Sequence, residues 1–199
     1  MKVRNILGLI GRGKIMFSDE LINKIDKFLN KNLSIVFDFK FNGLLLFYGD
    51  SLKRVMIDDD VDSKYEFVLL CYEEDNVAEL LKRNKFKYKY DENNGYYFKY
   101  KKMDIYIRIV NDLCYVCNYS TDFLFYDVLR RQIISFGAKT SILRREIIDY
   151  NEIEKSDRSD LKLAIKFINY FSDGNKKIKF KIMNKGIYFI NKLRRFFRG

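Results

Sequence analysis

Apolar residues along this chain recur with two different periods, and the period indicates where helices and strands lie. Between Leu21 and Leu29, apolar residues recur every three or four positions, which is typical of a helix with one buried side. Ser18 precedes this run and can cap the first turn, where acidic residues suit the helix dipole. We therefore expect a helix from Ser18 to Asn30.

The most regular pattern runs from residue 64 to residue 110 and predicts a strand, a short helix, a hairpin and a second long strand. The expected bounds are 65–71 for the strand, 76–84 for the helix, 86–90 and 96–101 for the hairpin, and 103–110 for the second long strand. Alternation with period two in the last strand predicts one apolar and one polar face.

The flanking segments give less regular patterns. Residues 34–41 predict a strand, and 44–48 form a continuous apolar run that fits either a strand or a short buried helix. Residues 49–64 predict a polar loop with a small strand at 55–57. Further on, we expect a helix at 121–136, an extended segment at 138–143, a short helix at 144–150, a helix at 159–171, a strand at 178–182 and a helix at 187–197.

Composition limits the chemistry. Apolar residues make up 48% of the 199 residues, enough for the core of one domain with a small appendage. The chain has no histidine, which excludes Ser-His-Asp and Cys-His catalysis. Cys114 and Cys117 have C-x-x-C spacing, but without a second pair we favour thiols in an apolar strand over a zinc site. The N-terminal apolar stretch is short, so we expect a cytoplasmic protein.

The net charge of +11 is concentrated at the C-terminus. Nine basic and no acidic residues lie between Lys176 and Arg198, which leaves 29 basic against 27 acidic residues elsewhere. This tail could bind RNA or DNA phosphates. It could instead lie on an anionic membrane, which would make the protein peripheral, or pack against the body with its charges in water. The sequence leaves these three alternatives open.

Two carboxylates stand near the starts of the long strands, Glu66 in the first and Asp104 in the second. With the order of predicted elements, they make the chain resemble the minimal nucleotidyltransferase superfamily, in particular its toxin-type and standalone branches. Residues 141–148 and 155–161 are similar to a later section of that family. The resemblance implies an α+β (α/β) fold with a small mixed sheet flanked by helices and a helical C-terminal part. It implies a nucleotidyltransferase-like domain at 1–174, with its core at about 32–171, and a basic extension at 175–199.

In that family, a glycine turn after the first strand holds nucleotide phosphates, and an Asp-x-Asp plus a third Asp on neighbouring strands hold divalent metal. Glycine lets backbone amides approach phosphate, and converging carboxylates provide the hard oxygen ligands of Mg²⁺. In this chain Gly43 takes the place of the turn, Glu66 that of the first carboxylate and Asp104 that of the third, while the second carboxylate is missing.

A second register fits the same family pattern. Here Gly49 and Ser51 belong to the phosphate turn, and Asp58 with Asp60 restores the pair of carboxylates. Its weakness is that no apolar strand follows Asp60 directly. The candidate site residues are therefore Glu66 and Asp104 as catalytic residues, Gly43, Gly49 and Ser51 at the nucleotide, and Asp58, Asp60, Glu66 and Asp104 as ligands of Mg²⁺.

The resemblance implies transfer of a nucleotidyl group from an NTP to a protein or RNA acceptor, or a degenerate relative that binds without catalysis. Two alternatives come from other classes. One is a metal-dependent glycosyltransferase in which the run Asp58–Asp60 would be the metal motif. The other is a non-enzymatic protein that binds nucleic acid or membrane through its basic tail. The aromatic cluster at 96–100 could stack on nucleic-acid bases, although a half-buried hairpin is the simpler interpretation.

Overall fold

The computed structural model describes residues 18–41, 43–61, 63–71, 77–92, 95–150, 158–172 and 177–182. These residues form two compact units. Unit 1 holds the described residues before 116 together with the hairpin Leu124–Ser135, and unit 2 holds Val116–Phe123 and the described residues from Phe136 onward. The predicted boundary after residue 174 stays a prediction.

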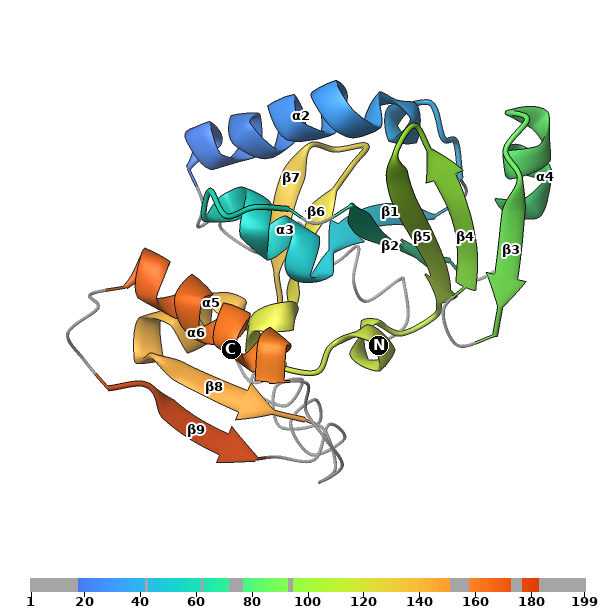
Figure 1. Ribbon diagram of the computed structural model, residues 1–199. Helices are drawn as coiled ribbons and strands as arrows, with labels where there is room; N and C mark the ends of the chain where they lie inside the picture. The colour runs from blue at the N-terminus through green and yellow to red at the C-terminus, as the bar shows by residue number, and fades with distance from the viewer. Residues whose placement is uncertain are drawn as a thin grey trace. The chain divides into compact units, whose positions relative to one another are not determined.

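Unit 1 is built on a seven-stranded sheet with the strand order β3-β4-β5-β2-β1-β6-β7 (Figure 1). The strands are β1 (Leu44–Tyr48), β2 (Lys64–Leu70), β3 (Tyr88–Asp91), β4 (Gly95–Tyr100), β5 (Met103–Val110), β6 (Leu124–Asp127) and β7 (Gln132–Ser135). The pair β2–β5 is parallel and the other pairs are antiparallel, so the sheet is mixed. The central strands β1 and β2 carry continuous apolar runs because both of their faces are largely buried.

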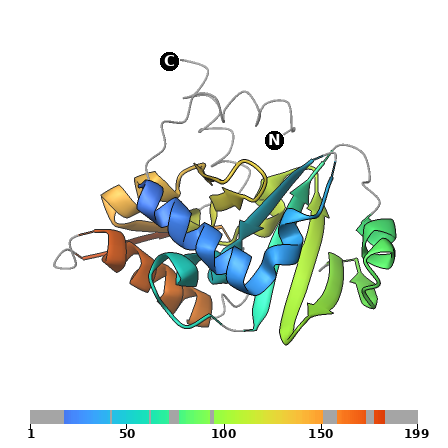
Figure 2. The ribbon, with the colours of Figure 1, turned by 90° about the horizontal axis from the view of Figure 1, so that it is seen from above.

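Helices of unit 1 cover one face of this sheet. They are α2 (Asp19–Leu33) and α3 (Gly49–Met56), with a 3₁₀ turn η1 (Ser34–Phe37) after α2. A third helix, α4 (Val77–Arg83), lies beside the edge strand β3 (Figure 1). Ser18 caps α2, and the helix buries its apolar stripe as predicted. Figure 2 shows α2 running across the strands, and α2 also packs against α3. Phe28 of α2 contacts Tyr65 of β2, which places the core between the helices and this face.

Unit 2 contains the helices α5 (Ala138–Arg144) and α6 (Arg158–Phe171) and a two-stranded parallel sheet of β8 (Glu146–Asp149) and β9 (Lys179–Ile182). The 3₁₀ turn η3 (Ser120–Asp122) joins this unit, and a further turn η2 (Leu113–Val116) precedes it in the chain. Buried Arg145 donates to Asn169 and Ser172, which fixes the start of β8 against α6. The described C-terminal part is therefore helical, as expected, with a small sheet added.

Several predicted elements are wrong. Residues 34–41 begin with η1 where we expected a strand, and 49–56 form α3 where we expected a loop with a strand at its end. The predicted helix at 121–136 is η3 followed by the hairpin β6–β7, because Asp127 accepts the backbone amides of Leu129 and Arg130 and so builds a turn. We expected an extended segment at 138–143 and a helix at 144–150, but the structure has the helix first and the strand second. Arg145 takes a left-handed conformation that ends α5, and β8 begins at the next residue.

Other predictions are confirmed. The elements at 65–71, 76–84, 86–101 and 103–110 are present as β2, α4, β3–β4 and β5, and those at 159–171 and 178–182 as α6 and β9. The ambiguous run at 44–48 is a strand. The α+β class with a mixed sheet flanked by helices is confirmed. Residues 155–157, the start of the family-like segment at 155–161, and the predicted helix at 187–197 lie outside the described residues. None of the described helices combines the length and apolarity that a membrane crossing requires.

Candidate functional site

The turn between β1 and α3 lies directly beside Glu66. Helix α3 begins at Gly49, whose φ of +73° suits glycine. A Cβ at this position would lie 2.8 Å from Oε2 of Glu66, so the carboxylate fills the space that a side chain would need. Gly43 lies at the other end of β1, where its backbone meets Leu70 and Cys71 at the end of β2. Of the two predicted turns, only the one at Gly49 therefore meets a predicted carboxylate.

Ser51 has a structural partner within this turn. Its hydroxyl donates to the backbone carbonyl of Lys64 at 2.5 Å, and the residue is buried. This bond ties the first turn of α3 to the start of β2. Ser51 thus helps to place Lys64 and Glu66 beside the turn, whether or not it also contacts a ligand.

Lys64 and Glu66 stand two positions apart on β2 and therefore share one face of the sheet. The Nζ atom of Lys64 lies 2.9 Å from Oε1 of Glu66 and 5.1 Å from the ring centre of Tyr106. Partial burial alone would lower the pKa of Lys64, but the hydrogen bond and charge of Glu66 outweigh it and raise the pKa above its usual value. Lys64 is therefore a cation at neutral pH, held against the predicted catalytic carboxylate.

Asp104 lies on β5 in register with Lys64 of the parallel strand β2, so the two residues are direct neighbours across the sheet. The hydroxyl of Tyr97 donates to Oδ1 of Asp104 at 2.8 Å, and Nζ of Lys99 lies 3.5 Å from the same oxygen. The hydrogen bond to Asp104 raises the pKa of the Tyr97 phenol, and the Asp104 charge raises the pKa of Lys99. The tertiary structure thus brings Glu66 and Asp104 onto adjacent strands, each with a lysine partner.

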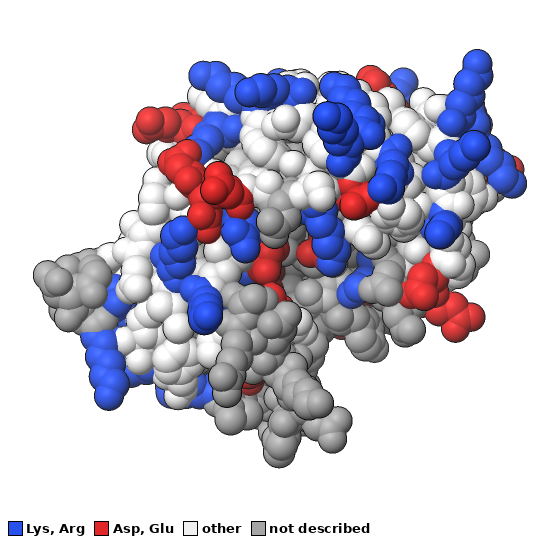
Figure 3. All heavy atoms as spheres, viewed as in Figure 1, with Lys and Arg blue, Asp and Glu red and all other residues white. Residues whose placement is uncertain are grey.

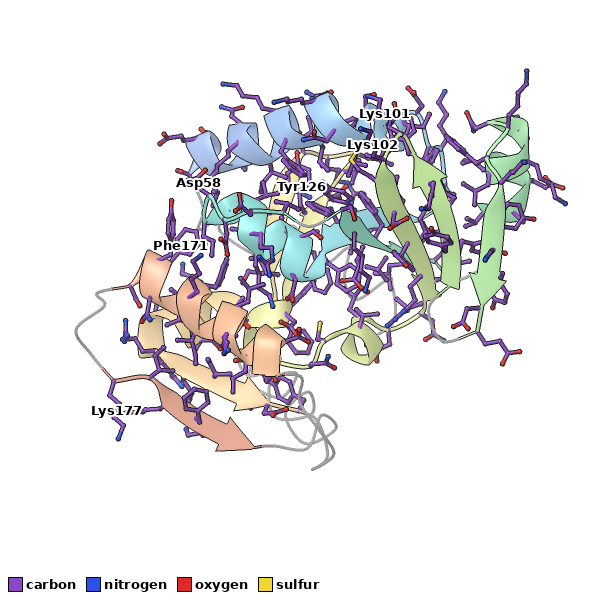
Figure 4. All side chains as sticks on the ribbon, in the orientation of Figure 1. Asp58, Lys101, Lys102, Tyr126, Phe171 and Lys177 are labelled. Atoms are coloured by element: carbon purple, nitrogen blue, oxygen red, sulfur yellow. The ribbon has the colours of Figure 1, made fainter. Side chains whose placement is uncertain are left out.

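Asp58 and Asp60 lie at the other end of α3 from Gly49. Eight residues of helix span about 12 Å. Asp58 pairs with Lys24 of α2 at 2.6 Å, and Arg54 donates to the backbone carbonyl of Asp60. Figure 4 labels Asp58 at this end of α3, and Figure 3, in the same orientation, shows acidic side chains gathered at the left of the molecule. The structure therefore does not bring this acidic run to the turn at Gly49 and Glu66.

These residues do not fit a Mg²⁺ site of the kind that the resemblance implies. Such a site needs converging carboxylates, since Mg²⁺ prefers hard anionic oxygens in an octahedral arrangement. Within the ranges that the structure describes, no three side chains of His, Cys, Asp or Glu gather closely enough to hold a metal ion. The position beside Asp104 that would provide another carboxylate is Lys64, an ammonium group. The assignment of Mg²⁺ ligands therefore stays a prediction, and the side chains around Glu66 and Asp104 do not support it.

Sequence reasoning missed Lys64. We paired Glu66 with the position two residues later, which is the buried apolar Val68. Alternation in a strand allows either neighbour, i−2 or i+2, to share the face of Glu66. Only the register with Asp104 and the contact with Gly49 show that Lys64 is the one at the site. The spacing from Gly49–Ser51 to β2 was the signal that could have found it.

Comparisons with known proteins give structural similarity only. No family model matches the chain, and no curated protein matches it. A structure of a tRNA-processing enzyme with CTP matches 80% of the chain with 14% identity and a TM-score of 0.47. An apo form of a tRNA-processing enzyme matches 92% with 13% identity and a TM-score of 0.48. A tRNA nucleotidyltransferase complexed with a primer tRNA and an incoming ATP analog matches 63% with 15% identity and a TM-score of 0.45.

The chain spans less than half the length of each of these three enzymes, at 44%, 49% and 47%. With TM-scores below 0.5, the similarities carry no argument about the activity, substrates or partners of this chain. The interpretation of the site therefore rests on its own residues, namely the turn at Gly49, Lys64, Glu66 and Asp104.

Proposed function

We propose that this chain is a nucleotidyltransferase-like protein that acts by binding and does not carry out metal-dependent nucleotidyl transfer. One observation carries the proposal. Lys64 occupies the strand position beside Asp104 where a carboxylate would complete a metal site, and its ammonium group pairs with Glu66. The turn at Gly49, which lies against Glu66, supports the relationship to the nucleotidyltransferase architecture.

The physical reason is charge. Transfer of a nucleotidyl group through two divalent cations requires carboxylates whose oxygens are open to the metal. Here Glu66 pairs with Lys64, and Asp104 pairs with Lys99 and accepts from Tyr97. A divalent ion would have to displace these donors and would also be repelled by the two ammonium groups. Transfer to a protein or RNA acceptor would therefore require a rearrangement of the whole cluster.

The alternatives from other classes gain no support from the described residues. The acidic run that a glycosyltransferase would use is paired with Lys24 and Arg54 at the far end of α3. Most of the basic tail, from residue 183 to 199, lies outside the described residues, so its binding to nucleic acid or an anionic membrane stays a prediction.

A transfer assay tests the proposal. The full-length chain is incubated with each of the four NTPs labelled at the α-phosphate, with Mg²⁺ or Mn²⁺, and with the chain itself and a mixture of small RNAs as acceptors. We expect no metal-dependent incorporation of label into protein or RNA. Incorporation that requires the metal and disappears in Asp104→Asn would show that the site is active and would refute the proposal.

A further inference from the structure

One face of the sheet in unit 1 carries two rows of polar and aromatic side chains. Register places Lys89, Tyr97, Tyr106 and Glu66 side by side across β3, β4, β5 and β2. A second row holds Lys99, Asp104 and Lys64. Residues opposite one another in a sheet point to the same side. We call this surface the polar face; it consists of Lys64, Glu66, Lys89, Tyr97, Lys99, Asp104, Tyr106 and Arg108.

The opposite face of β4 and β5 is packed. Phe98 of β4 and Ile105 of β5 are completely buried, and Phe98 contacts Phe39 and Phe86. The polar face is open by comparison: Lys89 and Lys99 are exposed, and Tyr97 and Tyr106 are only half-buried. Successive residues of a strand point to opposite faces. Within the aromatic cluster at 96–100, Phe98 therefore points into the core and Tyr97 lies on the polar face.

The aromatic rings of the polar face form a platform. The rings of Tyr97 and Tyr106 lie 5.0 Å apart between centres at an angle of 41°. Hydrogen bonding from its hydroxyl to Asp104 fixes the ring of Tyr97 in place. The ammonium group of Lys64 lies over the ring of Tyr106, and this half-exposed side chain can move from the ring at small cost. Two rings held side by side on an open sheet face can take the planar faces of bases.

Charge complements this platform. The polar face has four basic residues, Lys64, Lys89, Lys99 and Arg108, against two acidic ones. Both carboxylates have lysine partners on the face itself, so the excess charge seen by a ligand is positive. The row from Lys89 to Glu66 crosses three strand spacings, or about 14 Å. A surface of this size, with rings at its centre and cations around them, matches a chain of phosphates and unpaired bases.

We propose that the polar face binds single-stranded nucleic acid, with bases stacked on Tyr97 and Tyr106 and phosphates contacted by Lys89 and Lys99. Unpaired strands fit this chemistry better than duplexes because the faces of bases in a duplex are already stacked on one another. The inference goes beyond the loss of transfer. Transfer by the wild type would refute the proposed function and leave this binding intact, and failure of the binding would leave the loss of transfer untouched.

Fluorescence anisotropy on the full-length chain tests the inference. The probes are a fluorescein-labelled RNA single strand of about 12 nucleotides, a length within the range of known single-strand sites, and a duplex of the same length. We expect tighter binding of the single strand. Each base stacked on a ring contributes about 1–3 kcal/mol, so replacing both rings by Tyr97→Leu with Tyr106→Leu should weaken this binding by at least about thirtyfold. It should leave the salt dependence unchanged, because no charge is lost.

Matched variants separate the two contributions. Tyr90→Leu removes an exposed tyrosine from the opposite face of the same hairpin and should leave the affinity unchanged. Lys89→Gln with Lys99→Gln should reduce the magnitude of the slope of log K against log salt by about 1.4. Lys31→Gln on α2, outside the polar face, should not reduce this slope by the same amount. Tyr97→Phe keeps the ring and loses only the hydroxyl that donates to Asp104, so it should bind more tightly than Tyr97→Leu with Tyr106→Leu. Any loss of affinity that the leucine variant shows and Tyr97→Phe does not can therefore be assigned to the missing rings.

The tail from Lys176 to Arg198 adds the same background charge to every variant, so it cannot produce these differences. Circular dichroism confirms that each variant is folded. Equal affinity for duplex and single strand, or equal affinities of the Tyr97/Tyr106 variant and Tyr90→Leu, would overturn the inference. So would a salt slope that stays unchanged when Lys89 and Lys99 are replaced.

Discussion

Replacing Lys64 by aspartate should turn the cluster at the start of β2 into a metal site. The substitution removes the ammonium group that pairs with Glu66 and adds a carboxylate directly beside Asp104 in the parallel register. Three carboxylates would then stand on adjacent strands, which is the arrangement that a divalent cation needs. If Lys64 is what separates this chain from a metal-binding site, Lys64→Asp should bind Mn²⁺ or Mg²⁺ and the wild type should not.

The expected energies can be estimated from the geometry. The pair Lys64–Glu66 has exposed fractions of 56% and 26%, so its loss costs only about 0.2–1 kcal/mol. Carboxylates about 5 Å apart repel by about 3 kcal/mol at an effective dielectric constant of about 20, and by less than 1 kcal/mol in bulk water. For half-exposed side chains we expect the metal-free variant to lose about 1–2 kcal/mol of unfolding free energy. Bound metal at one hundred times its dissociation constant should add about 2.7 kcal/mol.

Thermal unfolding with and without Mn²⁺ measures this difference. A gain of about 2.7 kcal/mol corresponds to a rise in Tm of about 5–10 °C for a chain of this length. Lys64→Asn is the matched control because it removes the ammonium group without adding a carboxylate, and it should show no metal response. Two results would refute the reasoning: Lys64→Asp unfolding at the same Tm with and without Mn²⁺, or an equal Mn²⁺-dependent shift in the wild type.

Four further predictions concern stability. Gly49→Ala should cost about 1–2 kcal/mol in urea unfolding, because φ is +73° and the neighbouring atom belongs to the flexible Glu66 side chain. Gly95→Ala should cost more, since its Cβ would lie 2.3 Å from the backbone oxygen of Ile107. Tyr126→Phe should cost about 1–3 kcal/mol, because the buried Tyr126 hydroxyl donates to Asp26 of α2 (Figure 4). Burial and Asp26 also raise the pKa of Tyr126 far above 10, so the wild type should lose unfolding free energy above about pH 10 more steeply than Tyr126→Phe.

The sign of the pH effect follows from proton binding. Above about pH 10 the unfolded chain releases the Tyr126 proton and the folded chain retains it, so rising pH favours unfolding by up to about 1.4 kcal/mol per pH unit. Parallel pH curves for the wild type and Tyr126→Phe would contradict this assignment. For the glycines, a Gly49→Ala variant that costs as much as Gly95→Ala would contradict the distinction between a flexible and a backbone neighbour.

The local sequence pattern was sufficient to predict an element where it fits only one type of secondary structure. The period-two alternation of β5 predicted its bounds, and the capping serine with its helical stripe predicted the start of α2. Local pattern failed where a continuous apolar run fits either a helix or a strand. At 123–126 the turn made by Asp127 decided for a strand, and at 145 a left-handed residue ended one element and began another.

The sequence by itself determined the class of the fold and the two strands that carry Glu66 and Asp104, because hydrophobic period and strand starts are local properties. Only the tertiary structure decided which residues meet. Parallel pairing of β2 with β5 placed Lys64 beside Asp104, and the left-handed Gly49 brought α3 against Glu66. The antiparallel pairing of β4 with β5 put Tyr97 and Tyr106 together on the polar face. The register of β2 with β5 is set by packing between segments that are distant in the chain, so no local pattern could specify that Lys64 meets Asp104.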